Sequence, residues 1–437
     1  MWFNEGTFYQ IYPLGYCGAE QYNDFGEVRH RFHKIEENIP HLKDLGVTAV
    51  LFNPLFESVS HGYDTVDFYK VDRRLGTNDE FKTLVQKLHA AGIRVVLDGV
   101  FNHVGREFPP FVQVRKEREN TFYRFWFNIN FQADNNYGDG FSYENWEGHN
   151  ELVKLRLDNL DLQKYLMDAV RFWMDEFGID GLRLDVSYLL PPWFFELLRR
   201  TVKEKRDDFF LMGEVILIGN FASNLSPERL DSITNYECFK GMVSAFNSDN
   251  LFEIEHSLSR LFADTPWALY KGKQLFNFLD NHDVPRVYTA LKEKENIEAL
   301  YTLLFTVPGI PCLYYGGEYA AEGDKGDFDR RLRPCVDDLD KNKAPALEAH
   351  IRKLCAIRKE SRALACGSYA KAWLQNKSLA FVRAADGETL YPCFNIDGAA
   401  VSFSVGGGEA EDLLTGERVD LSRVEMPPHS ARILRKI

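Results

Sequence analysis

The sequence lacks the features that would place the chain in a membrane, on nucleic acid or in an oxidising compartment. No run approaches the roughly 20 uninterrupted apolar residues that a membrane helix needs. A net charge of -13 without any basic stripe disfavours the phosphate backbone of nucleic acids. The seven cysteines are odd in number and scattered without a CxxC pair, which indicates reduced thiols and no zinc site. We therefore expect neither a membrane nor nucleic acid as a partner.

The beginning of the chain also lacks an export signal. The segment MWFNEGTFYQIYP has no basic stretch followed by an uninterrupted apolar one. Together with the reduced thiols, this predicts a cytoplasmic protein. The shares of hydrophobic (45%) and charged (27%) residues are ordinary for a globular chain, and 437 residues allow one large domain with appendages. Nothing in the sequence indicates an oligomeric state.

Short apolar runs alternate with amphipathic helical segments through most of the chain, as is typical of a parallel sheet wrapped by helices. One predicted helix carries Phe81, Leu84, Val85 and Leu88 on a single face. The predicted strands cover residues 8–12, 47–52, 94–100, 181–186, 209–215, 232–236, 275–279 and 310–315. This alternation predicts an α/β fold, the (β/α)8 TIM barrel, which typically takes about 250 residues.

Two stretches interrupt the alternation. The polar, aromatic-rich stretch from His103 to about Leu155 has no helical period and is too long for an ordinary loop. Beyond about Glu360, short alternating runs such as LAFVRA and LYPCFNI are broken by DG and GGG. We therefore predict a barrel over residues 1–103 and 156–360, a small inserted domain after strand three over 104–155, and a C-terminal antiparallel β-sandwich over 361–437.

Four of the predicted strands end in clusters of polar residues. The clusters are Asp98 with Asn102 and His103, Arg183 with Asp185, Glu214 alone, and Asn281 with His282 and Asp283. In a barrel the C-terminal ends of all strands meet at one mouth. A charge inside a run such as VVLDGV loses water, which is costly unless the charge is paired or used. For one such acid a buried ion pair or a helix cap is the better explanation, but four clusters at the same end predict a site.

The chemistry of an acid-rich barrel mouth without metal-ligand spacing is typically glycosyl transfer to water. One carboxylate attacks the anomeric carbon, and a second, kept protonated, gives its proton to the leaving oxygen. A separation of about 5 Å between the two would retain the configuration through a covalent intermediate. The sequence thus predicts a glycosidase that requires no cofactor.

The segments that carry these clusters resemble the conserved segments of the α-amylase superfamily. They are DGVFNHVG at 98–105, GLRLDV at 181–186, GEV at 213–215 and FLDNHD at 278–283. The resemblance extends from about Phe8 to the C-terminus, and NPLFESVSHGYDTVDFYKVD is most similar to the cyclomaltodextrinase, neopullulanase and maltogenic amylase group. Because the predicted barrel begins almost at Met1, we expect neither the N-terminal domain of that group nor dimerisation through it.

The resemblance implies a role for each buried charge. Asp185 would be the nucleophile, Glu214 the acid/base, and Asp283 the third essential carboxylate, which binds hydroxyls of the distorted sugar. Arg183 would hold Asp185 and keep its pKa low. Asp98 would brace the site from behind.

Further residues would contact the substrate. The resemblance implies that His103 and His282 hydrogen-bond the sugar before the cleaved bond, and that Tyr63 stacks on it. Taken alone, each histidine would more often be structural, and a core tyrosine is the alternative for Tyr63. In the segment GDFDRRLRP, Asp327 and Arg331 would serve the next subsite outward.

The sequence departs from the superfamily in two respects. Many secreted α-amylases carry a Lys-His pair after the nucleophile where this chain has Tyr188 and Leu189, so internal cleavage of long polymers is less expected. Asn102 occupies the family's calcium position, but no acidic partners are assignable, and residues 21–24 only partly resemble the other calcium loop. Calcium is therefore left open as a cofactor.

We predict a retaining hydrolase of α-1,4 linkages in maltooligosaccharides, with cyclodextrins as further candidate substrates. A 4-α-glucanotransferase and an α-1,6-glucosidase are the alternatives on the same scaffold, since both use the same three acids. Val186, which follows the nucleophile, is common to several of these specificities and does not decide the linkage. A glucan-binding protein without activity is the alternative from another class, and the presence of all three acids argues against it.

Overall fold

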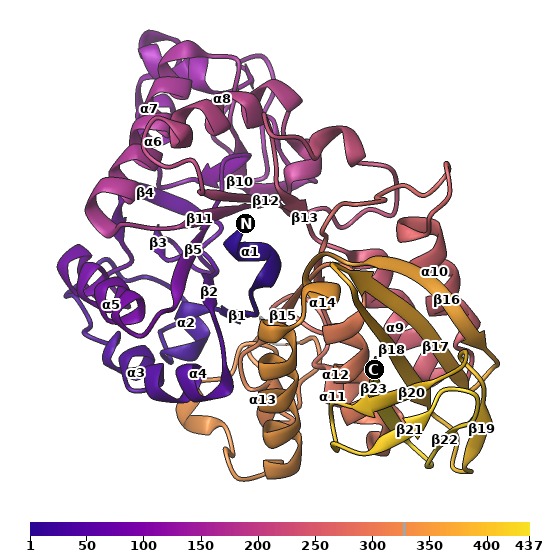
Figure 1. Ribbon diagram of the computed structural model, residues 1–437. Helices are drawn as coiled ribbons and strands as arrows, with labels where there is room; N and C mark the ends of the chain where they lie inside the picture. Colours follow the sequence, from indigo (N-terminus) through magenta and orange to yellow (C-terminus); the bar gives the residue numbers. More distant parts are fainter. Residues whose placement is uncertain (327–328) are drawn as a thin grey trace.

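The computed structural model describes residues 1–326 and 329–437, and its centre is a barrel of eight parallel strands (Figure 1). Around the sheet the order is β13-β12-β11-β5-β2-β1-β15-β14, and a parallel bridge between Thr234 and Phe276 joins its two ends. The strands are β1 (Phe8–Ile11), β2 (Ala49–Phe52), β5 (Arg94–Gly99), β11 (Gly181–Leu184), β12 (Phe210–Gly213), β13 (Ser232–Ile233), β14 (Phe276–Phe278) and β15 (Ile310–Tyr314). Each lies inside a run predicted as a strand, and the predicted (β/α)8 barrel is confirmed.

Helices surround the barrel, and capping residues and buried apolar faces explain where they form. In the longest helix between β2 and β5, Thr77 and Glu80 form a capping box, and the predicted apolar face is buried against the sheet. The helices of the barrel are α1 (Trp2–Glu5), α2 (Pro13–Tyr16), α3 (His33–Glu36), α4 (Ile39–Leu45), α5 (Asn78–Ala90), α7 (Leu160–Phe172), α8 (Pro192–Lys203), α9 (Tyr236–Asn247), α10 (Phe252–Phe262), α11 (Val287–Ala290), α12 (Ile297–Thr306) and α13 (Pro345–Glu360).

The barrel interior is filled by side chains, and one end is closed by α1 (Figure 1). Phe8, Leu51 and Met212 belong to the apolar cluster inside the strands. Phe3 from α1 joins this cluster, with its ring 4.6 Å from that of Phe210. This end of the barrel is packed with apolar side chains. The polar clusters lie at the other end, where the C-terminal ends of the strands meet.

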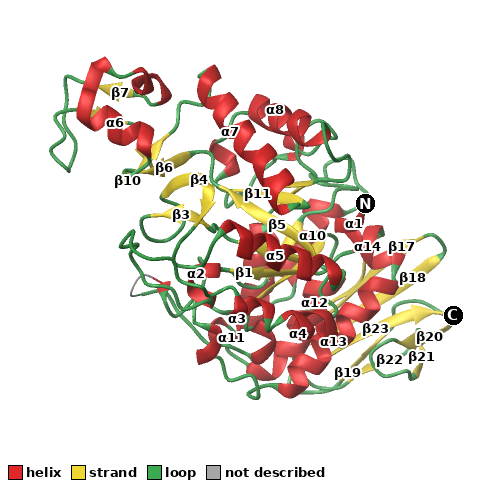
Figure 2. Ribbon diagram, turned by 90° about the vertical axis from the view of Figure 1, so that its left-hand side faces the viewer, coloured by secondary structure: helices red, strands yellow, loops and turns green. Residues whose placement is uncertain are grey.

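The segment after β5 forms a small lobe that projects from the barrel (Figure 2). It contains β6 (His103–Gly105), α6 (Pro109–Glu117), β7 (Ile129–Asn130), β8 (Ser142–Tyr143), β9 (Asn145–Trp146) and β10 (His149–Lys154). These strands form two small antiparallel sheets, β6-β10-β9 and β7-β8. The domain boundary predicted at 103/104 falls inside β6. A further hairpin, β3 (Phe56–Ser58) and β4 (Thr65–Val71), follows β2 and carries Tyr63 in its turn.

The C-terminal part is antiparallel, as its alternating sequence predicts. Its larger sheet has the order β16-β17-β18-β23-β20-β21, and β19 pairs with β22 in a second, two-stranded sheet. The elements are α14 (Arg362–Cys366), β16 (Ser368–Leu374), β17 (Ser378–Ala385), β18 (Glu388–Asn395), β19 (Val401–Phe403), β20 (Glu409–Asp412), β21 (Arg418–Asp420), β22 (Val424–Met426) and β23 (Ser430–Lys436). Among the described residues, no helix is long and apolar enough to cross a membrane.

Two buried arginines join the barrel to this C-terminal part. Arg358 of α13 donates hydrogen bonds to the carbonyls of Asn4, Gly6, Gly309 and Leu364. Arg383 of β17 donates to the carbonyls of Thr306, Leu364, Ser368 and Gly367. Both side chains are almost fully buried, and neither has a carboxylate partner among the described residues. Backbone carbonyls alone therefore satisfy both guanidinium groups.

Candidate active site

The C-terminal ends of the strands bring the predicted polar clusters together around one guanidinium group. Arg183 on β11 places Nη1 2.8 and 2.6 Å from the two carboxylate oxygens of Asp98 on β5. The same Nη1 is 3.2 Å from Oδ1 of Asp185, and Nη2 is 2.5 Å from Oε1 of Glu214. The parallel register places Arg183 beside both Asp98 and Met212, so neighbouring strands supply the three carboxylates. One cation thus holds the acids of strands β5, β11 and β12.

Asp185 keeps one oxygen atom without a partner. Its Oδ1 faces Arg183, whereas its buried Oδ2 forms no hydrogen bond among the described residues. His103 Nε2 is also buried and unpaired, and it lies 3.9 Å from this Oδ2. Two facing polar atoms without partners are costly in a folded chain, so they indicate a place for ligand atoms.

Glu214 is held by the residue that follows the nucleophile candidate. The amide of Val186 donates to Glu214 Oε2 at 3.0 Å. Val186 adopts a left-handed backbone conformation with φ of 41°, which is unusual for a β-branched residue. Ser187 adds two hydrogen bonds from its amide and hydroxyl to the Glu214 carbonyl, at 3.0 and 2.7 Å. The strained turn after β11 therefore fixes the carboxyl group at the end of β12.

Asp283 lies across the mouth and is the most accessible of these acids. Its side chain is 40% exposed. Its Oδ2 lies 3.0 Å from Nε2 of His282, and its Oδ1 lies 3.1 Å from the Arg333 guanidinium. Arg333 also lies over the ring of Tyr12, with 4.6 Å between guanidinium and ring centre. Asp283 is thus oriented by its neighbours while one side remains available to a ligand.

Tyr63 forms part of a buried polar network below the mouth. Its hydroxyl contacts Nε2 of His282 at 2.5 Å and Asp98 Oδ2 at 3.3 Å. Asn53, fully buried at the end of β2, donates to Tyr63 and Asp98. Gln10 at the end of β1 donates to His282 Nδ1 at 3.2 Å. The rings of Tyr63 and His282 are nearly parallel, at 11°, which leaves flat faces beside the acids.

Around this centre a cleft of about 1430 Å³ opens to solvent. One wall comes from the inserted lobe, where Trp146 lies 6.1 Å from the His103 ring and stacks on His149. Tyr188 donates to the Glu147 carboxylate at 3.2 Å, which links the turn after the nucleophile to this lobe. Tyr188, the first of the two residues that replace Lys-His, therefore links the turn to a wall of the cleft.

The protonation of the acids follows from burial and crowding. Burial raises the pKa of Asp185 well above its ordinary value, and the Glu214 charge raises it further, against the lowering effect of Arg183. Burial also raises the pKa of Glu214 and of Asp98. One guanidinium cannot neutralise three carboxylates, so the cluster keeps a shared proton. The prediction that Arg183 keeps the pKa of Asp185 low is therefore wrong on balance.

For the two histidines and Asp283 the pKa is shifted in the opposite direction, downward. Burial lowers the pKa of both His103 and His282 to about 3, so both imidazoles are neutral near pH 7. For Asp283, burial opposes ionisation, but the His282 ring and the Arg333 guanidinium outweigh it and hold the pKa below its ordinary value. The site thus combines acids whose pKa is raised with one whose pKa is lowered.

Of the pair predicted after β15, only Arg331 can be placed. Asp327 lies outside the described residues. Arg331 lines the cleft, but Arg333, two positions further, contacts Asp283 and also lies 3.5 Å from Asp329. Three arginines in DRRLR look alike in the sequence, and only the path of the loop decides which one reaches the acid.

Other residues at the site carried a usable signal in the sequence. Gln10, Tyr12 and Asn53 are polar or aromatic residues at the ends of strands one and two, so the rule that identified Asp98 would also have identified them. Trp146 lies in the aperiodic stretch, where no sequence pattern marks one aromatic residue among many.

Among the described residues, no cluster of carboxylates marks a calcium site. The Asn102 amide donates to Nδ1 of His103 at 3.1 Å, and no group of three or more His, Cys, Asp or Glu that could hold a metal exists among the described residues. In the loop around residues 20–26, guanidinium groups bind the oxygens. Arg31 pairs with Glu20 at 2.6 and 2.7 Å, and Arg74 donates to the carbonyls of Glu20, Gln21 and Ser60. No step of a reaction is therefore assigned to a metal.

The comparisons with known proteins point in one direction. The family described as alpha amylase, catalytic domain, matches residues 10–360. A cyclomaltodextrinase from a Bacillus species is 31% identical over 91% of this chain and 74% of its own length, and neopullulanase 2 from Thermoactinomyces vulgaris is 31% identical over 96% and 74%. The structure of a cyclic α-maltosyl-(1→6)-maltose hydrolase from Arthrobacter globiformis, in complex with that compound, has a TM-score of 0.83, 25% identity and coverage of 100% and 99%.

Proposed function

The chain belongs to the α-amylase family, and from this premise we propose that it hydrolyses α-1,4 linkages in maltooligosaccharides and cyclodextrins with retention of configuration. The observation that carries the proposal is the single guanidinium that contacts both Asp185 and Glu214 while Asp185 Oδ2 stays without a partner. Such a pair of carboxyl groups is what double displacement requires. The structure of a relative holds cyclic α-maltosyl-(1→6)-maltose, and the cleft of about 1430 Å³ in this chain supports testing cyclic as well as linear glucans.

The first step follows from the contacts of the two acids. Asp185 Oδ2 is the free atom, so it attacks the anomeric carbon while Oδ1 stays on Arg183. The bond from the anomeric carbon to the glycosidic oxygen breaks, and that oxygen takes a proton from Glu214, whose pKa is raised by burial. The product is a glycosyl ester on Asp185 and a released sugar with a free hydroxyl.

The second step reverses the roles. Glu214, now ionised, removes a proton from water, whose oxygen attacks the anomeric carbon and releases Asp185. Asp283, held ionised by His282 and Arg333, binds hydroxyls of the sugar and stabilises the oxocarbenium-like transition state. Neutral His103, with its unpaired Nε2, and the face of Tyr63 position the same sugar ring.

The test is a chromatographic product profile on maltotriose, β-cyclodextrin and isomaltose, with Asp185→Asn as the blank. Glucose and maltose from maltotriose, and linear products from β-cyclodextrin, are expected. Cleavage of isomaltose alone would replace the proposal with an α-1,6-glucosidase. Products longer than maltotriose would replace it with a 4-α-glucanotransferase, and binding without turnover would indicate a glucan-binding protein.

A further inference from the structure

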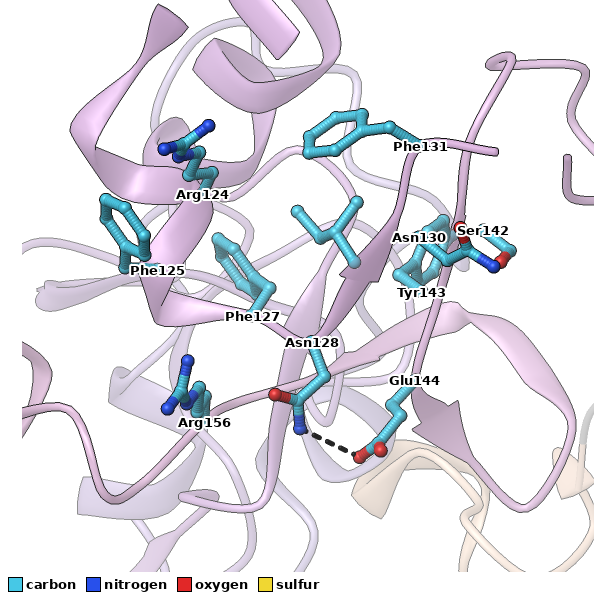
Figure 3. Close-up of a pocket in the computed structure, with 11 residues that line it drawn as sticks. Arg124, Phe125, Phe127, Asn128, Asn130, Phe131, Ser142, Tyr143, Glu144 and Arg156 are labelled. Carbon is cyan, nitrogen blue, oxygen red and sulfur yellow. Dashed lines mark hydrogen bonds between the residues drawn. The ribbon is translucent and has the colours of Figure 1, made fainter. Parts of the chain in front are cut away.

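The inserted lobe contains a hollow that is separate from the cleft. Its volume is about 570 Å³, and it lies between the turn η2 (Phe122–Trp126) and the β7–β8 hairpin (Figure 3). None of its lining residues lines the cleft at the barrel mouth. We call it the lobe groove, and it is lined by Arg124, Phe125, Phe127, Asn128, Ile129, Asn130, Phe131, Ser142, Tyr143, Glu144 and Arg156.

Aromatic rings form the walls and floor of the lobe groove. Phe125 is 43% exposed on one side, and the half-buried Phe131 lies on the other (Figure 3). Phe127 is buried beneath them, where its ring packs 5.2 Å from Phe111. Exposing a large ring to water has a cost, and ring faces suit the C–H surfaces of sugars. The two sides thus offer apolar contacts above a rigid floor.

Planar polar groups lie between the rings. The Asn128 side chain donates to Glu144 Oε2 at 3.1 Å, the dashed line in Figure 3, so Oε1 of Glu144 and the side-chain oxygen Oδ1 of Asn128 are left to accept hydrogen bonds. The Asn130 side-chain oxygen accepts from the Gln132 amide at 2.9 Å. The side-chain nitrogen of Asn130 donates to no other described residue. Donors and acceptors beside apolar faces are the combination that recognises a polyol.

The charges of the lobe groove are largely taken up by neighbours. Arg156 pairs with Asp158 at 2.9 Å, and Glu144 lies 3.7 Å from Lys154. The guanidinium of Arg124 lies over the ring of Phe125, 4.5 Å from its centre. Among the described residues, Arg124 is the one charged lining residue without an ion pair, so the groove has no cluster of like charges to select an anion or a cation. A neutral ligand with apolar faces and many hydroxyls fits this surface better than a phosphate or a charged peptide.

We propose that the lobe groove is a second binding site for α-glucan chains, which holds a short stretch of a substrate outside the cleft. The ligand class rests on the proposed function, whereas the groove itself rests on the contacts above. Two sites on one rigid surface raise the effective concentration of a long chain at the cleft, and leave substrates too short to reach both unaffected.

The experiment separates the two sites. In the full chain carrying Asp185→Asn, calorimetry with maltoheptaose should show two sites, and adding Phe125→Ala should leave one. In the active chain, Phe125→Ala should raise KM for amylose about fivefold, as expected for losing one ring contact, with maltotriose turnover unchanged. The matched control is Phe122→Ala, a neighbouring ring that is 53% exposed and does not line the groove.

The outcomes are distinguishable. If Phe125→Ala behaves like Phe122→Ala in both measurements, or if the Asp185→Asn chain binds maltoheptaose at a single site, the lobe groove is not a glucan site. Asn128→Ala removes a polar contact instead of a ring, so it tests the same site should Phe125→Ala melt early. Two binding sites in the Asp185→Asn chain, together with no hydrolysis of maltotriose by the unmodified chain, would support the lobe groove as a glucan site and overturn the proposed function.

Discussion

The barrel mouth and the junction with the C-terminal sheet both bury arginine, but they satisfy it in opposite ways. At the mouth, Arg183 faces three carboxylates, and Asp185 Oδ2 stays without a partner among the described residues. At the junction, Arg358 and Arg383 each donate to four backbone carbonyls and meet no described carboxylate.

The difference separates groups that stabilise the chain from groups that serve a ligand. A buried guanidinium with all its donors paired stabilises the contacts it joins, and its removal would leave several carbonyls without partners. Crowded carboxylates with an unpaired oxygen cost stability, and the fold keeps them because a substrate completes the site. Substitutions at the barrel mouth and at the junction with the C-terminal sheet test this contrast.

The largest effect is expected for the acids at the mouth. Asp185→Asn and Glu214→Gln should each lower the rate of maltotriose hydrolysis by about 10³–10⁴ or more, because nucleophile and proton donor act as a unit. The melting temperature should stay the same or rise, since a buried acid with a raised pKa is removed. Asp175→Asn, 61% exposed at the outer side of the barrel, is the control with unchanged rate. A large fall in melting temperature would assign the acids a structural role.

At the junction the effect should appear in stability alone. Arg358→Met should lower the free energy of unfolding by about 3–5 kcal/mol, because it leaves buried carbonyls unpaired. Arg362→Met, whose side chain is 54% exposed, should change it by less than about 1 kcal/mol. Urea unfolding measures both, and kcat of the folded variants should be unaltered. Equal losses would show that burial of Arg358 is unimportant.

The loop around residues 20–26 provides a third comparison, between guanidinium groups and a metal ion. Arg74→Met should lower the free energy of unfolding by about 2–3 kcal/mol, since it breaks bonds to Asp72, to two loop carbonyls (Glu20 and Gln21) and to the carbonyl of Ser60. A chelator should leave the melting temperature and the activity of the unmodified chain unchanged. A melting temperature that rises when calcium is added would refute this account of the loop.

The smallest effect is the pH dependence of stability. Asp185 has a raised pKa in the folded chain, so between its unfolded value of about 3.9 and that pKa the folded state binds more protons. The free energy of unfolding therefore falls as pH rises through this window. The advantage of Asp185→Asn in thermal unfolding should grow as the pH rises above about 4. A constant difference would mean that the pKa of Asp185 is not raised.

The strands and the placement of the acids could be predicted because both follow from periodic patterns. Alternating runs fixed eight strands, and parallel strands send their ends to one mouth, so Asp98, Asp185, Glu214 and Asp283 could be placed near each other. The arginine that contacts Asp283, Arg333, could not be predicted, because its position depends on the path of a loop. The pKa of Asp185 was predicted with the wrong sign, since the balance depends on how many acids share Arg183, which only three dimensions reveal.

The lobe groove could not be predicted for a related reason. Its rings come from a stretch with many aromatic residues and no period, so exposed Phe125 and buried Phe127 look equivalent in the sequence. Only the pairing of β7 with β8 places Asn130 and Ser142 side by side on the same surface.

The guanidinium of Arg74 also changes how the cleft wall responds to its surroundings. A bound metal stabilises a loop only as far as its free concentration exceeds its dissociation constant, so the loop weakens on dilution or in competition with other ligands. Arg74 is a cation attached to the chain itself, and it cannot diffuse away. The cleft wall formed by Glu20 and Gln21 is therefore held by a cation that is part of the chain, and its stability does not depend on the concentration of any ion in solution.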